Sequence, residues 1–242
     1  MKYLKLILLL VVVTTVMVSC VEDSTGEVSR VTTYPTITIE GDATVYVEKG
    51  TTYEDAGAIS MAGETELETT TTLGSGTYSS AAFGTDVVDT YTITYSALNE
   101  DGFAGNALRT VVVYPAVVDM ATDLSGAYSS DIQRVGSDLQ EGNSYVFITS
   151  TGANTYDLSH AVGGYYDLGR AYGPAYAARG AVITANDISS NDITVSDAQF
   201  PTWGNVVTVT DFTVDAANNT ITYTGTGDWG AAFEVILTKV QF

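Results

Sequence analysis

The feature that most constrains this 242-residue chain is the alternation of apolar and polar side chains along it. Residues 35–40, 43–48, 91–97 and 206–214 alternate with a period of two, and clusters of Gly, Asn and Asp separate such runs. Successive side chains of a strand point to opposite faces of a sheet, so this period predicts strands with one buried face. No stretch after residue 19 has a helical period. The sequence therefore predicts an all-β protein of antiparallel strands.

The first 19 residues stand apart from this pattern. Lys2 and Lys5 precede an unbroken apolar run over residues 6–13, and small residues then lead to Cys20. A basic start, a short apolar stretch and a small-residue end are typical of a secretory signal peptide, and the stretch is too short for a membrane-spanning helix. We therefore expect residues 1–19 to be removed from the mature protein.

Cys20 is the single cysteine of the chain, and its surroundings resemble the lipidation site of bacterial lipoproteins. The match departs at Met17, where these signals usually carry leucine. The resemblance implies a lipid anchor on Cys20, and several acyl chains on one residue hold a protein stably on a membrane. A plain secretory signal followed by a free thiol is the alternative.

The residues after the cysteine predict where the protein is displayed. Residues 20–32 are polar and without period, which is typical of a flexible tether. Glu22 and Asp23 resemble the acidic export signal that sends lipoproteins of some glycan-foraging bacteria to the outer face of the outer membrane. We therefore expect an outer-membrane protein that faces the cell exterior; a solvated linker without this signal is the alternative.

The charge balance excludes one class of partner. Loss of the signal would leave seven basic residues against 29 acidic ones. Nucleic-acid binding needs a basic surface, so we expect no nucleic-acid partner. The acidic balance also disfavours electrostatic attraction to anionic lipid, which leaves the lipid anchor as the membrane contact. The mature length suits two small domains, and each must fold without disulfides.

Residues 33–115 form the first predicted domain. Several short strands with regular turn signals indicate a β-sandwich of immunoglobulin (Ig) type. We expect residues 64–72 to be a strand plus a loop, and residues 99–106 to be a long turn. Pro115 cannot donate to a sheet ladder, so the last strand should end near Tyr114.

This segment resembles the bacterial Ig-like domain of the pesticidal-crystal-protein type. The match departs at Asp89-Thr90 and in the long turn. The resemblance implies a spacer or adhesive stalk. The residues that carry it are Pro35, Ile37, Ile39, Gly41, Val47, Gly50, Tyr53, Asp55, Gly57, Ala58, Tyr91, Ile93, Tyr95, Ala97, Gly105, Asn106, Ala107, Arg109, Val111 and Val113.

A short linker, residues 116–122, leads to the second predicted domain, residues 123–242. The antiparallel rhythm predicts a second β-sandwich or a small β-barrel. A turn is expected at residues 215–219. The expected strands cover residues 124–130, 143–149, 155–158, 181–184, 192–195, 206–214, 220–224 and 233–240.

The second domain resembles the C-terminal domain of outer-membrane lipoproteins found beside starch-utilisation-type glycan uptake systems. The resemblance rests on residues 124–128, 163–180, 203–204 and 233–239. The resemblance implies no activity, but it implies partners: we expect outer-membrane glycan importer proteins to bind this chain.

The segment 163–180 is the predicted ligand-binding region because it gathers tyrosines, glycines and two arginines. Sugars commonly bind on aromatic faces, with polar groups bonding their hydroxyls. Read as a strand, it would point Tyr165 and Tyr166 to opposite faces. The alternative is that these rings only fill the core. The candidate ligand-binding residues are Tyr165, Arg170, Tyr172, Tyr176, Arg179, Trp203 and Trp229, with Tyr166, Asp167 and Asp228 beside them.

Catalytic chemistry finds little support in the sequence. His160 is the only histidine, and we expect it to be a polar residue at a strand end. Zinc needs three or four His or Cys ligands, and a serine hydrolase would need a Gly-x-Ser-x-Gly elbow that the chain lacks. We therefore expect no catalytic residue, no metal and no cofactor. The predicted function is non-enzymatic glycan or oligosaccharide binding for an outer-membrane uptake system.

Two other functions stay open at this point. One is a structural or adhesive surface lipoprotein that binds a protein partner, which a large smooth apolar patch would favour. The other is a small glycoside hydrolase, which two carboxyl groups in a cleft would favour.

Overall fold

The computed structural model describes residues 32–137 and 139–242, and for Ser144 only the backbone. The predicted signal peptide, Cys20 and residues 20–31 of the tether lie outside the described residues. Strands dominate the described part, so the predicted all-β fold class is confirmed. None of its helices is long and apolar enough to cross a membrane.

The first domain consists of two facing sheets, a three-stranded one in the order β1-β3-β4 and a four-stranded one in the order β2-β7-β6-β5. Strand β2 runs parallel to β7, and the other neighbours are antiparallel. Alternate residues of the central strands, such as Tyr91, Ile93 and Tyr95, fill the core between the sheets. The strands are β1 (Thr36–Ile39), β2 (Thr44–Glu48), β3 (Ala58–Ala62), β4 (Thr65–Leu67), β5 (Thr70–Leu73), β6 (Asp89–Leu98) and β7 (Ala104–Tyr114).

Two expectations for this domain need correction. The long turn expected at residues 99–106 is confined to residues 99–103, because Asn99 closes it early: the Asn99 Oδ1 atom accepts the N–H of Phe103 at 2.8 Å. The expected strand plus loop at residues 64–72 is instead two short strands, β4 and β5. The predicted end of the last strand before Pro115 is confirmed.

Arg109 is a fully buried cation in the Ig-like domain, with 1% of its surface exposed. Its guanidinium forms an ion pair with Asp55 and donates to the backbone oxygens of Glu40 and Asp42. Burial acts to raise the pKa of Asp55, but hydrogen bonds from tyrosines, Tyr95 first, and the charge of Arg109 hold it below its usual range. One side chain thus ties β7 to the turns that flank β2.

The second domain is one nine-stranded antiparallel sheet in the order β12-β11-β10-β9-β8-β16-β15-β14-β13. The sheet curls until its ends approach: the Asn191 side chain, after β11, bonds the backbone N–H and C=O of Val214 in β14. Of the two predicted architectures, the barrel-like one describes this domain. Its strands are β8 (Gly126–Arg134), β9 (Leu139–Gly152), β10 (Thr155–Leu158), β11 (Ala181–Asp187), β12 (Asp192–Val195), β13 (Ala198–Gln199), β14 (Val206–Asp215), β15 (Thr220–Gly227) and β16 (Ala232–Val240).

Residues 163–180 lie between β10 and β11 and contain no strand, so the strand argument that would separate Tyr165 from Tyr166 does not apply. They form a π-helical turn, η2 (Tyr165–Gly169), and a 3-10 turn, η3 (Pro174–Tyr176). Gly163 and Gly164 both have positive φ, and a Cβ on Gly163 would lie 2.5 Å from Ser130 Oγ. Only glycine fits this tight, left-handed bend, which folds the segment back over the sheet.

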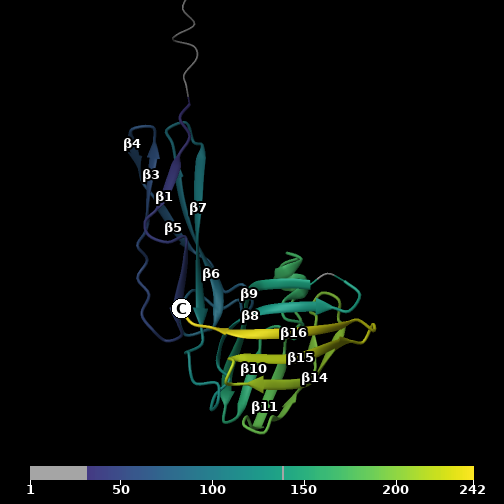
Figure 1. Cartoon of the computed structure of the whole chain (residues 1–242). Coiled ribbons are helices and arrows are strands. Elements are labelled where there is room, and N and C mark those ends of the chain that lie inside the picture. Colours follow the sequence, from purple (N-terminus) through teal and green to yellow (C-terminus); the bar gives the residue numbers. More distant parts are fainter. Residues whose placement is uncertain (1–31, 138) are drawn as a thin grey trace, which may run out of the picture.

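The two domains contact each other through a small shared core. Val112 and Tyr114 of β7 pack with Ala127 and Phe147 of the second domain. Figure 1 shows the long strands β8, β9 and β16 running across the direction of β6 and β7. Near the C-terminus, Phe242 stacks on Tyr46 of the Ig-like domain, with ring centroids 4.3 Å apart.

We predict that Arg109→Leu destabilises the Ig-like domain by about 3 kcal/mol, because it leaves the Asp55 carboxylate without its cation. Urea unfolding followed by circular dichroism measures the change. Arg109→Lys should also lower stability, since one ammonium group cannot reproduce the planar fork of donors. Lys49→Leu is the matched control, because it removes a cation from an exposed position of the same domain. If Arg109→Leu and the wild type unfolded with the same urea midpoint, the prediction would be contradicted.

Candidate functional site

Exposed aromatic side chains gather at one place on the second domain. Tyr172, Trp203 and Trp229 are 52%, 42% and 39% exposed, and the half-buried Tyr176 and Tyr166 lie among them. Ring centroids are 4.9 Å apart for Tyr176 and Trp203 and also for Tyr166 and Trp203. We call Tyr166, Tyr172, Tyr176, Trp203 and Trp229 the aromatic platform.

Hydrogen bonds between loops hold the platform together. The Thr202 hydroxyl donates to the Ala175 oxygen at 2.7 Å, which joins the Trp203 loop to η3. On the other side, Asn205 Nδ2 donates to Asp228 Oδ1 at 2.7 Å and so joins the Trp203 loop to the Trp229 turn. The platform therefore has a fixed backbone although it is built from three separate loops.

Buried groups support the tryptophans from below. The ring of Phe200 is fully buried, and its centroid lies 5.2 Å from Trp203 and 5.7 Å from Trp229. The Trp229 indole also rests on Gly227, where a Cβ would overlap the ring. Because Gly227 has no side chain, Trp229 can lie flat against β15.

The platform is faceted rather than flat. Most of its rings meet steeply, such as Tyr166 and Trp203 at 85°, and only Tyr166 and Tyr172 are stacked at 29°. Two shallow hollows result, of about 340 and 280 Å³, and both use Trp203. Tyr172 and Tyr176 line one hollow, and Tyr166, Asn205 and Trp229 line the other. Each hollow offers a ring face, and the second adds an amide for hydrogen bonding.

Of the predicted ligand-binding residues, four lie on this platform and three lie elsewhere. Tyr172, Tyr176, Trp203 and Trp229 come together as described above. Tyr165, Arg170 and Arg179 lie off the platform, as set out in turn.

Tyr165 is completely buried, and its ring fills the core against Phe233. Arg170 covers Tyr165 and donates to its hydroxyl at 2.9 Å. Arg179 lies over the ring of Tyr78, 4.9 Å from its centroid, at the contact between the domains. These three residues therefore support the structure around the platform without belonging to it.

A buried polar chain, which the sequence did not indicate, joins the two domains. The Ser159 Oγ atom lies 2.6 Å from His160 Nδ1, and His160 Nε2 lies 2.8 Å from Asp167 Oδ2. Tyr78 of the Ig-like domain donates to the same Asp167 oxygen at 3.1 Å. Since Ser159 Oγ already accepts the N–H of Phe147, its own proton is free to bond His160 Nδ1, and Nε2–H then faces Asp167.

His160 follows the end of β10, as expected of a strand-end polar residue, and it is buried inside this network. The signal that could have found it is the pair Gly163-Gly164, whose tight bend brings Asp167 back to His160. On the side of the Ig-like domain, Asp89 positions the Tyr78 loop. Its carboxylate accepts the N–H groups of Tyr78, Ser79 and Thr90.

Charges in this network follow from burial and pairing. Burial alone would raise the pKa of Asp167, but His160 and the Tyr78 hydroxyl outweigh it and hold the pKa below its usual range. Burial, then the charge of Asp167, raises the pKa of Tyr78 far above its usual value, so Tyr78 remains a donor. The described residues contain no cluster of three His, Cys, Asp or Glu that could hold a metal ion.

Comparisons with known proteins agree with this two-domain architecture. Residues 118–239, half of the chain, match the family model of a C-terminal domain. The chain belongs to this C-terminal-domain family. Residues 37–113 match a second family model, described as bacterial surface protein, Ig-like domain. This match confirms the expected bacterial Ig-like domain.

A solved structure shares the fold. It is the crystal structure of the lipoprotein BT2262 from Bacteroides thetaiotaomicron, with a TM-score of 0.61 and 24% sequence identity. The match covers 85% of this chain and all of that one. At this identity the likeness shows the fold alone. Comparison with curated proteins gave no match.

The lowered pKa of Asp167 predicts an acid-dependent loss of stability. A carboxylate with a depressed folded-state pKa adds stability that is full above about pH 4 and is lost as the pH falls through the folded pKa. We expect Asp167→Asn to be less stable than the wild type at neutral pH. Its free energy of unfolding should also fall less steeply than that of the wild type between about pH 5 and 2. Tryptophan fluorescence during urea unfolding measures this, because both tryptophans lie in the second domain.

Asp192→Asn, which removes an exposed carboxylate, is the matched control. If the free energy of unfolding changed with pH equally in the wild type and in Asp167→Asn, Asp167 would not contribute in this way.

Proposed function

We propose that the chain is a non-enzymatic cell-surface lipoprotein that binds glycan or oligosaccharide on the aromatic platform. The observation that carries the proposal is the exposure of Tyr172, Trp203 and Trp229 side by side on a fixed frame. Large aromatic side chains in water cost free energy, and adjacent ones supported by dedicated loops mark a binding surface.

The chemistry of the platform suits a sugar. Its ring faces can cover the C–H face of a pyranose, and Asn205 beside them can bond a hydroxyl. No lining residue of either hollow carries a charge. The platform therefore favours neutral glycans, and the acidic balance of the chain disfavours polyanionic ones.

The same hollows support binding over hydrolysis. A glycoside hydrolase needs two carboxyl groups on either side of the scissile bond. No Asp or Glu lines the two hollows, and the nearby Asp228 bonds Asn205. A protein partner on the same rings is an outcome of the test below rather than a second proposal.

The placement at the cell surface rests on separate evidence. The signal sequence, the single Cys20 and the acidic Glu22-Asp23 favour a lipid anchor on the outer face of the outer membrane. The bacterial surface Ig-like domain and the description of BT2262 as a lipoprotein support a cell-surface lipoprotein. We propose that the Ig-like domain holds the platform away from the membrane, where outer-membrane glycan importer proteins would be its partners.

The test is a glycan-array and affinity-gel screen of residues 31–242 beside the variants Trp203→Ala and Tyr172→Ala/Tyr176→Ala. Trp203 lines both hollows, so we expect Trp203→Ala to weaken binding at least tenfold, as loss of about 1.5–3 kcal/mol of aromatic burial implies.

Tyr34→Ala is the matched control, because Tyr34 is an exposed aromatic residue of the Ig-like domain. Melting temperatures of all variants identify any that fail to fold. Binding of no glycan by the folded wild type, or equal binding by Trp203→Ala, would overturn the proposal. Retention of a protein on the platform instead would indicate the adhesive function.

A further inference from the structure

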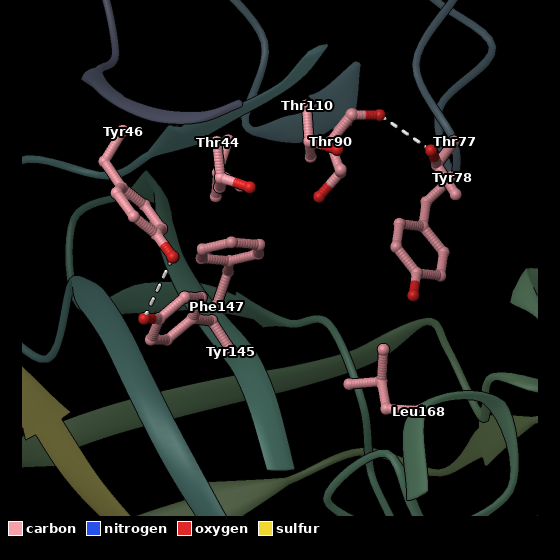
Figure 2. A pocket seen from close by; sticks show the side chains of 10 residues that line it. Thr44, Tyr46, Thr77, Tyr78, Thr90, Thr110, Tyr145, Phe147 and Leu168 are labelled. Atoms are coloured by element: carbon pink, nitrogen blue, oxygen red, sulfur yellow. Dashed lines mark hydrogen bonds between the residues drawn. The ribbon is translucent and has the colours of Figure 1, made fainter. Parts of the chain in front are cut away.

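The contact between the two domains contains a cleft of about 430 Å³, which is within the usual size range of small-molecule sites. Figure 2 shows its two walls: Thr44, Thr90 and Thr110 lie on one side, and Phe147 and Tyr145 lie on the other. It shares no lining residue with the aromatic platform. The cleft is therefore a second candidate site.

The first wall carries three threonine hydroxyl groups of the Ig-like domain beside the apolar Val112. Thr44 of β2 pairs with Thr110 of β7, and Thr90 of β6 pairs with Val112, two residues further along β7. This pairing puts the three threonines on one face of the sheet. None of the three hydroxyls bonds another residue in the described part of the chain, so all three are available to a ligand.

The opposite wall is aromatic. Phe147, from β9, is almost completely buried yet reaches the cleft, and Leu168 of η2 extends the apolar side. Tyr78 stands at one end, as Figure 2 also shows. Its hydroxyl donates to Asp167. The apolar wall and the hydroxyl wall thus come from different domains.

The other end of the cleft is closed by two tyrosines. Tyr46 and Tyr145 meet edge-on, with centroids 5.6 Å apart, and the Tyr145 hydroxyl donates to that of Tyr46 at 3.4 Å. That hydrogen bond, with burial, raises the pKa of Tyr145 to about 12, so Tyr145 is neutral in physiological buffers. No Asp, Glu, Lys, Arg or His lines the cleft.

We propose that this cleft binds a single neutral saccharide ring, with its C–H face toward the apolar wall of Phe147, Tyr145 and Leu168 and its hydroxyls toward the three threonines. One apolar wall, one wall of hydroxyls and no charge match a ligand that has an apolar face, many hydroxyls and no charge. Because the walls belong to different domains, the bound sugar bridges them. The site stands independently of the aromatic platform.

The experiment titrates the intact soluble chain, residues 31–242, with D-glucose, D-galactose, D-mannose and N-acetyl-D-glucosamine, followed by saturation-transfer NMR and calorimetry. The test variant is Thr44→Val/Thr110→Val, which removes two hydroxyls, keeps the side-chain shape and suits a strand. The matched control is Thr208→Val/Thr222→Val, two strand threonines of the second domain that lie outside the cleft. Trp203→Ala reports on the platform.

We expect one or more of the sugars to bind, the cleft variant to lose at least tenfold in affinity, and the Thr208→Val/Thr222→Val control to bind as wild type. Binding also raises the melting temperature of the wild type, because only the folded, docked domains form the site. Absence of binding by all four sugars would overturn the proposal. So would binding that the cleft variant retains, and binding lost only in Trp203→Ala would assign the sugar to the platform.

Discussion

The hydrogen bond from the Tyr78 hydroxyl to the Asp167 carboxylate is the contact on which the relation of the two domains depends. Each partner is placed by its own domain: Asp89 fixes the Tyr78 loop through backbone N–H groups, and the bend at Gly163-Gly164 brings Asp167 to His160. A buried carboxylate without such donors would carry a large desolvation cost. The domains therefore satisfy each other's polar groups, and the apolar contact of Val112 and Phe147 forms beside them.

Two aromatic surfaces follow from this arrangement, and they are built differently. The platform lies within the second domain, where three loops hold Tyr176, Trp203 and Trp229 in place. The cleft exists only when both domains are docked, because Thr110 and Phe147 come from different domains. Both are lined by uncharged residues in a strongly acidic protein, and the ligand that we propose for each is a neutral polyhydroxylated molecule.

The alternation of apolar and polar residues predicted the strands well, because each strand shows this alternation within its own sequence. The end of β7 before Pro115 and the turn between β14 and β15 are confirmed for that reason. The shape of the segment around Tyr165 was not predicted, because it depends on two left-handed glycines and on packing against Ile132 and Val235. The platform was predicted in part, since composition flagged Tyr172 and Trp203. The cleft could not be predicted: Thr44 and Thr110 look like ordinary solvent-facing strand positions until a second domain covers them.

The order of strands in the second domain also sets when it can fold. Strands β8 to β12 form one meander and β13 to β16 another, and the two are joined where β16 pairs with β8. The last strand of the chain therefore occupies the middle of the sheet, beside the first strand of its domain. Until it arrives, β8 has an open edge and the core residues Phe233, Val235 and Leu237 are missing. Such long-range pairing makes folding slow, and the sheet of the second domain cannot be completed before the residues of β16 have been synthesised.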